Sequence, residues 1–192
     1  MKLVLASASP RRKELLKQIG VQFSVRPVDI CEDVIAGETP LAYVSRLAEE
    51  KARACSIKGD EVVLGSDTTV VLDGRIIGKP MCKARSIEIL KALSGKTHQV
   101  LTAVALIGKE QTNVVVVETD VTFRDISLQE CESYWLTGEP IDKAGSYGIQ
   151  GLGAVFVDKI EGSYSSVVGL PLSQTAELLK VAGVDIWQLD NI

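Results

Sequence analysis

The first residues whose types and spacing could do chemistry lie near the N-terminus, in Ser7-Ala8-Ser9-Pro10-Arg11-Arg12. A serine followed by a proline suits the N-cap and first position of a helix, which would put Arg11 and Arg12 in its first turn. Two arginines there oppose the helix dipole, but a phosphate bound by the backbone N–H groups and the guanidinium groups would reverse that penalty. The pattern indicates an anion site that includes Ser7, Arg11 and Arg12. Two solvated surface arginines are the alternative.

Two acidic positions could act on a metal ion or a water molecule. Asp67, in Gly65-Ser66-Asp67-Thr68, follows an apolar run, so we expect it just after a strand, where open α/β sheets bind ligands. Glu32 lies in the acidic stretch 29–33, which follows another expected strand. Carboxylates suit Mg²⁺ or Mn²⁺ and can act as a base toward water. The alternatives are an Asx-turn at Asp67 and a solvated loop around Glu32.

Three further positions could contact a phosphorylated ligand. Lys51 falls on an expected helix and Lys79 at the end of an expected hairpin, where each could also be an ordinary exposed lysine. Gln150 lies in a glycine-rich passage, 138–153, whose glycines would let the backbone approach a ligand closely. Its amide can both donate to and accept from the edge of a nucleobase, although the passage could also be a plain loop. His98, the one histidine, has no motif around it, and we do not expect it to be catalytic.

Strands and helices that would position these residues are mixed along the chain. Strands are expected at 2–6, 22–26, 61–65, 99–107, 113–124 and 154–160, with a hairpin around Asp73-Gly74. Helices are expected at 13–19, from Pro40 to about Cys55, at 83–93, from a capping box at 127–130 to Leu136, and at 172–182. This order predicts an α/β or α+β fold with a mixed sheet. Without repeats or an obvious linker, we expect a single domain over residues 1–192.

Composition excludes several classes of protein. A chain of 192 residues with 46% hydrophobic and 24% charged residues can bury its own core. A net charge of -4 with dispersed basic residues disfavours binding to duplex nucleic acid. No apolar run approaches the roughly 20 residues that span a bilayer, and the first residues enter a strand rather than a signal sequence. Four widely spaced cysteines indicate neither a disulfide scaffold nor a zinc site. We therefore expect a cytoplasmic protein with no nucleic-acid or membrane partner.

Several of these segments together resemble the Maf family of nucleotide pyrophosphatases, in order and over nearly the whole chain. The matching segments are Ala6-Ser7-Ala8-Ser9-Pro10-Arg11-Arg12, Leu47-Ala48-x-x-Lys51-Ala52, Gly65-Ser66-Asp67-Thr68, Gly78-Lys79-Pro80, Gly138-Glu139-Pro140, 142–151, Gly162-Ser163-Tyr164 and Val168-Gly169-Leu170-Pro171. The resemblance implies a two-lobed α/β fold with flanking helices, similar to that of the inosine triphosphate pyrophosphatases, with the nucleotide in the cleft between the lobes.

The resemblance also implies roles for single residues. Asp67 matches the family's proton acceptor, and Glu32 matches an acid of the metal and water site, so both are expected to be catalytic and to hold Mg²⁺ or Mn²⁺. The positions matching the family's phosphate contacts are Arg11, Arg12, Lys51 and Lys79. Three positions that differ with substrate among family members are here Arg12, Thr68 and Gln150, a combination that resembles the branch acting on dTTP and UTP.

The expected activity is therefore hydrolysis of dTTP, UTP or modified pyrimidine nucleoside triphosphates to the monophosphate and diphosphate. A regulator of cell division that binds a nucleotide or a partner without turnover is one alternative. A metal phosphatase that releases orthophosphate is another, although such enzymes usually carry a second aspartate two residues after the first, where this chain has Thr69. The sequence does not fix the oligomeric state, and a homodimer is compatible with it.

Overall fold

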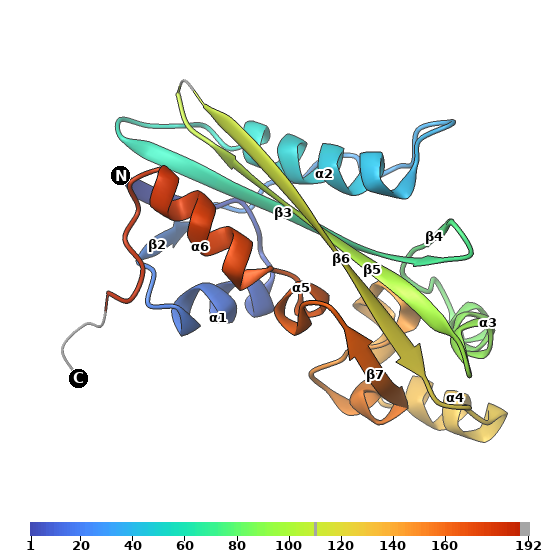
Figure 1. Ribbon diagram of the computed structural model, residues 1–192. Coiled ribbons are helices and arrows are strands. Elements are labelled where there is room, and N and C mark those ends of the chain that lie inside the picture. The colour runs from blue at the N-terminus through green and yellow to red at the C-terminus, as the bar shows by residue number, and fades with distance from the viewer. Residues whose placement is uncertain (110, 189–192) are drawn as a thin grey trace. The chain divides into compact units, whose positions relative to one another are not determined.

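The computed structural model describes residues 1–109 and 111–188 (Figure 1). Within these residues there is one seven-stranded sheet, ordered β2-β1-β3-β5-β6-β7, with β4 paired to β3. The strands are β1 (Lys2–Leu5), β2 (Phe23–Val25), β3 (Glu61–Leu72), β4 (Arg75–Ile77), β5 (Thr97–Ile107), β6 (Thr112–Phe123) and β7 (Val157–Glu161). β1 pairs in parallel with β2 and β3, whereas β3–β4 and β6–β7 are antiparallel. The mixed sheet predicted from the sequence is confirmed.

Helices connect and flank the strands. They are α1 (Pro10–Gln18), α2 (Pro40–Ala54), α3 (Lys83–Leu93), α4 (Leu128–Leu136), α5 (Tyr164–Val168) and α6 (Leu172–Val181), with 3-10 helices η1 (Glu139–Asp142), η2 (Ala144–Ser146) and η3 (Leu152–Phe156). The capping box that opens α4 is present as predicted, with the Ser127 hydroxyl accepting from Glu130 N. No helix in the described ranges is both long enough and apolar enough to cross a membrane.

Two compact units make up the chain. The first contains Met1–Asp67, Thr102–Val117 and the described residues from Gly169 onward, and the second contains Thr68–Leu101 and Glu118–Val168. Strands β3, β5 and β6 each contribute residues to both units. The expectation of one domain over residues 1–192 stays a prediction.

A glycine in β3 sets how closely α2 packs in the first unit. A Cβ added to Gly65 would lie 2.7 Å from Ala52 N and closer still to Ala48 O, so any larger residue would push the helix away. Side chains alternate between the two faces of a strand, and the next residue, Ser66, donates instead to Gly169 O at 3.1 Å, just before α6. Helix α2 therefore lies directly against the face of β3 that Gly65 and Asp67 share.

The position of Asp67 corrects one prediction. We expected it after the end of a strand, but β3 runs without interruption from Glu61 to Leu72, and Asp67 lies in its middle. The strand extends because its first residues pair with β1 and its last residues pair with β4 through the hairpin at Asp73-Gly74. The strand predicted at 61–65 and the first arm of the predicted hairpin are therefore two parts of the one strand β3.

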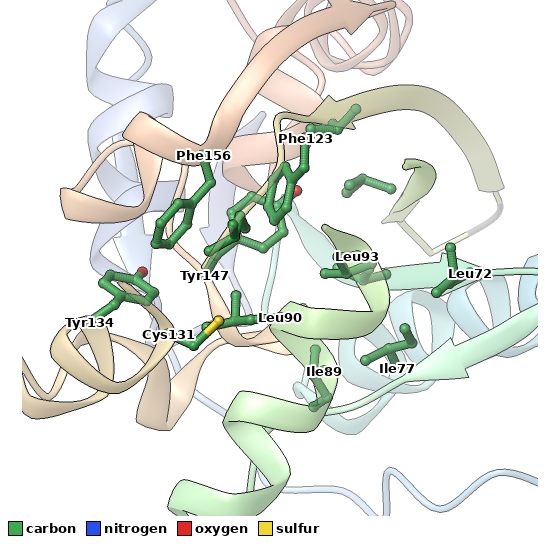
Figure 2. Packing of buried hydrophobic residues seen from close by; sticks show 14 residues of the cluster. Leu72, Ile77, Ile89, Leu90, Leu93, Phe123, Cys131, Tyr134, Tyr147 and Phe156 are labelled. Atoms are coloured by element: carbon green, nitrogen blue, oxygen red, sulfur yellow. The ribbon is translucent and has the colours of Figure 1, made fainter. Parts of the chain in front are cut away.

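The second unit has a core of its own, built around aromatic rings (Figure 2). Phe123 packs edge-on against Tyr147, with ring centroids 4.7 Å apart, and Tyr134 packs edge-on against Phe156 at 5.0 Å. Aliphatic residues of β3, β4 and α3 complete the cluster, among them Leu72, Ile77, Ile89, Leu90 and Leu93. The core anchors α4 and the glycine-rich passage that follows it.

Two boundaries in this part of the chain differ from the prediction. The strand expected from Ala154 begins at Val157, because η3 occupies the residues before it. The five-residue helix α5 was not predicted at all, since it is too short to give a helical pattern of apolar residues.

Candidate active site

A lysine bridges the two predicted acidic residues. Lys51 Nζ, from α2, lies 2.6 Å from Glu32 Oε1 and 2.7 Å from Asp67 Oδ1. The side chains of Lys51 and Asp67 are only 12% and 10% exposed, whereas that of Glu32 is 46% exposed. The alternative interpretation, in which Lys51 lies on an ordinary exposed helix face, is therefore wrong. The structure brings all three residues together, within the first unit.

The same arrangement fits a divalent cation by its donor chemistry. Two carboxylate oxygens converge on one positive charge, and Mg²⁺ typically uses one or two carboxylates together with substrate phosphates and waters. In the described part of the chain, no three His, Cys, Asp or Glu side chains gather in a metal-binding group. A metal held by Glu32 and Asp67 would therefore need further oxygens from the substrate and from water. It would also have to displace the Lys51 ammonium from its position between them.

Helix α2 also holds the loop that carries Glu32. The Tyr43 hydroxyl donates to the backbone oxygen of Glu32 at 2.9 Å, and Arg46 Nη2 donates to the backbone oxygen of Asp33 at 3.0 Å. Arg46 makes a two-pronged ion pair with Glu38, at 2.7 and 2.8 Å, and Glu38 in turn accepts from Ile35 N. The bidentate hydrogen bond with Arg46 lowers the pKa of Glu38. The loop is thus tied at several backbone positions to the helix that supplies Lys51.

The pKa of Tyr43 is affected by its burial and by the acidic pair. Burial, followed by the negative charges of Asp67 and Glu32, raises the pKa of Tyr43 to about 12. Its phenol therefore remains protonated at neutral pH and keeps its donor proton for the Glu32 carbonyl.

The serine and arginine cluster belongs to the same unit. Arg12 Nε donates to Gly169 O at 2.9 Å, and its Nη1 donates to Ser7 Oγ at 3.2 Å. Because Ser66, next to Asp67, also donates to Gly169 O, this carbonyl links the first turn of α1 to β3. Ser9 occupies the N-cap position of α1, as expected. Among the described residues, however, its side chain makes no capping hydrogen bond to the helix.

Electrostatic interactions also link Arg12 to the two carboxylates. Burial lowers the pKa of Arg12, while the charges of Asp67 and Glu32 oppose this effect and that of Arg11 adds to it. Arg11 lies beside Arg12 in the first turn of α1 and is half-buried. Positive and negative groups therefore lie within range of each other's charge, as a site for a phosphate and its cation requires.

The remaining predicted residues belong to the second unit. Thr68 follows Asp67 in β3, so its side chain points to the opposite face of the strand. Lys79 follows β4 and is exposed, and Gln150 is exposed in the turn between η2 and η3. Their roles toward a nucleotide stay predictions.

Residues that sequence reasoning missed are Tyr43, Arg46 and Glu38, the group that fastens the acidic loop. Tyr43 lies eight residues, about two helical turns, before Lys51, and Arg46 lies one turn after Tyr43, so polar side chains on the predicted helix that carries Lys51 were a signal that could have found them. Glu38 gave no such signal, because only the folded loop brings it beside Arg46.

Comparisons with known proteins identify the family to which the chain is similar. A family profile described as "Maf-like protein" matches residues 2–182. A protein of Hahella chejuensis named "dTTP/UTP pyrophosphatase" is 51% identical over 97% of this chain and 94% of its own length. A protein of Shewanella sp. with the same name is 56% identical over 96% of this chain and 100% of its own length. Among solved structures, a HAM1 protein from Coxiella burnetii matches with a TM-score of 0.52 at 18% identity, covering 94% of this chain and 99% of that one, which supports the fold.

Proposed function

This chain belongs to the Maf-like protein family, and from that premise we propose that it is a nucleoside triphosphate pyrophosphatase that acts on dTTP and UTP. It hydrolyses the bond between the α- and β-phosphates and releases the nucleoside monophosphate and pyrophosphate. The observation that carries the proposal is the pair of carboxylates, Glu32 and Asp67, joined by Lys51 in the same unit as Arg12 and Ser7. This set of charges suits a triphosphate and its cation.

The first-turn arginines and Ser7 would receive the phosphates. The guanidinium groups of Arg11 and Arg12 can contact phosphate oxygens in pairs, and the free N–H groups at the start of α1 would bind the same anion. Held in this way, the α-phosphorus is fixed relative to an attacking water, and positioning together with charge stabilisation accounts for most of the acceleration of phosphoryl transfer.

Asp67 is the proposed proton acceptor. As water attacks the α-phosphorus, a new oxygen–phosphorus bond forms, the bridging bond to the β-phosphate breaks, and pyrophosphate leaves. Asp67 takes the proton from the water, and its low exposure keeps bulk water from competing for it. Lys51, once separated from the carboxylates, carries its positive charge to the phosphates, and Lys79 is proposed to do the same.

Glu32 and Asp67 would hold a divalent cation, Mg²⁺ or Mn²⁺, whose chemistry is to neutralise phosphate charge and lower the pKa of a bound water. Gln150, Thr68 and Arg12 are proposed to select the base, since the exposed amide of Gln150 can match the donor and acceptor pattern of uracil or thymine. We also infer a cytoplasmic location, where nucleoside triphosphates are abundant and thiols such as Cys31 and Cys82 stay reduced.

A panel of triphosphates tests the proposal. Purified protein is incubated with Mg²⁺ or Mn²⁺ and each common or modified nucleoside triphosphate, and pyrophosphate and orthophosphate are measured separately. We expect pyrophosphate, fastest from dTTP and UTP. Orthophosphate as the product would indicate a metal phosphatase, and tight nucleotide binding without either product would indicate a regulator.

A further inference from the structure

One carboxylate organises the glycine-rich loop from inside the second unit. Glu139, at the start of η1, accepts hydrogen bonds from Leu152 N at 2.8 Å, from Gly153 N at 3.0 Å and from the Tyr134 hydroxyl at 2.6 Å. The Tyr134 oxygen also accepts from Gly148 N at 3.1 Å. A single Tyr–Glu pair therefore ties both ends of the segment 148–153.

The glycines of this loop make room for that carboxylate. A Cβ at Gly151 would lie 2.8 Å from Glu139 Oε1 and closer still to Oε2, and a Cβ at Gly148 would lie 3.0 Å from Oε1. A Cβ at Gly153 would lie 2.6 Å from the Tyr134 oxygen. The sequence suggested that these glycines let the backbone approach a ligand. In the fold, the group that the backbone approaches is the chain's own Glu139.

The pair is itself fixed in the core. Tyr134 is buried, and its ring packs edge-on against Phe156 in the aromatic cluster, where Figure 2 shows the two rings side by side. The loop that it holds projects Gln150 into solvent, in a turn closed by the hydrogen bond from Gly151 N to Gly148 O at 3.2 Å. The backbone on either side of Gln150 is thus held by contacts at 148, 152 and 153.

We propose that Glu139, with Tyr134, is a positioning residue for base selection: it holds the loop so that Gln150 meets the edge of a pyrimidine base. The inference rests on the proposed function for its ligand. A glutamine at 139 keeps the size of the side chain but replaces one acceptor oxygen with an NH₂ group that faces the loop's N–H donors. The loop must then rearrange, although the reacting phosphates are held by residues of the first unit.

The test measures base preference instead of rate. Dissociation constants for non-hydrolysable α,β-methylene analogues of dTTP and dGTP are determined for the wild type, Glu139→Gln, Tyr134→Phe and the control Glu132→Gln. Glu132 is an exposed residue of α4 whose ion-pair partner is Lys83, away from the loop. We expect the preference for the dTTP analogue to fall about 10-fold in Glu139→Gln, the order of effect that follows loss of a hydrogen-bond partner that orients a binding residue, and less in Tyr134→Phe. The control should match the wild type.

Hydrogen exchange of the loop amides separates positioning from folding. Faster exchange at 148–153 together with an unchanged ratio of the two dissociation constants would overturn the proposal and leave Glu139 a purely structural role. If Glu139→Gln does not fold, as judged by circular dichroism, Tyr134→Phe decides the matter, because it keeps the buried ring. Binding needs no turnover, so failure to release pyrophosphate would contradict the proposed function and leave this measurement intact.

Discussion

The ammonium nitrogen of Lys51 lies 2.7 Å from Oδ1 of Asp67, although one residue is on helix α2 and the other is in the middle of strand β3, 16 positions later. Their contact depends on the close approach of helix and strand that Gly65 permits. A lysine in this place keeps two carboxylates together when no cation is bound, and it carries a charge that phosphates can use. The predictions below follow from this contact and from the groups around it.

Replacing Asp67 with Asn should lower turnover of dTTP at least ~100-fold, because the amide cannot accept the proton of the attacking water. Initial rates of pyrophosphate release with saturating Mg²⁺ would measure this. Asp73→Asn, in the exposed hairpin turn, is the matched control and should leave the rate unchanged. Near-normal turnover by Asp67→Asn would remove Asp67 from the chemistry.

Replacing Lys51 with Met should tighten the binding of Mn²⁺ to the nucleotide-free protein by about 10-fold, or about 1.4 kcal/mol, because the cation no longer competes with an ammonium group for Glu32 and Asp67. The same variant should turn over dTTP more slowly, since a charge for the phosphates is lost. Titration calorimetry with MnCl₂ tests the first effect, with Lys17→Met, on the exposed side of α1, as the control. Weaker Mn²⁺ binding in Lys51→Met would show that Lys51 does not occupy the position of the metal.

Replacing Arg46 with Gln should reduce kcat/KM for dTTP about 10-fold without unfolding the protein, because the loop that carries Glu32 loses its bidentate tie to α2. Arg46→Lys should recover only part of the loss, since an ammonium group cannot make the two-pronged contact. Arg53→Gln is the matched control on the same helix, where the arginine pairs with Glu49 at the surface. Equal kcat/KM in Arg46→Gln and Arg53→Gln would contradict a role for the loop's attachment.

His98 should make the protein less stable in mild acid. Its ring packs against Phe123 and Tyr147, its Nε2 shares a hydrogen bond of 2.9 Å with the Tyr147 hydroxyl, and burial lowers its pKa from 6.5 to about 4. The unfolded chain takes up a proton below about pH 6.5 and the folded chain does not until about pH 4. The contribution of His98 to the free energy of unfolding is therefore complete above pH 6.5 and is lost as the pH falls toward 4. At pH 5 the loss is about 2 kcal/mol.

Urea unfolding of the wild type and His98→Gln at pH 7 and pH 5 checks the size of this effect. Glutamine can still bond to Tyr147 but does not titrate, so the drop in unfolding free energy between the two pH values should be smaller in the variant by about 2 kcal/mol. The same drop in both proteins would assign the acid sensitivity to other groups.

Much of the fold could be read from local pattern. The bounds of α3 and the capping box of α4 were predicted because they depend on neighbours within a few residues, and so was the Asp73-Gly74 hairpin, where both turn residues have positive φ. The continuity of β3 was not predicted. A strand's length depends on which strands pair with it, and that information lies elsewhere in the chain.

The sequence by itself determined the kinds of groups in the site: two acids, two adjacent arginines and a lysine, in segments that resemble one family. Only the tertiary structure decided how they meet. It placed Lys51 between Glu32 and Asp67 and paired Arg46 with Glu38 beside the acidic loop. It also made the glycines at 148 and 151 the space that Glu139 occupies, and Gly153 the space for the Tyr134 hydroxyl. The physical reason is the distance along the sequence over which each interaction acts. Caps, turns and charge types follow from nearby residues, whereas an ion pair or a close backbone approach joins residues that only the packing of helices and strands brings within a few ångströms.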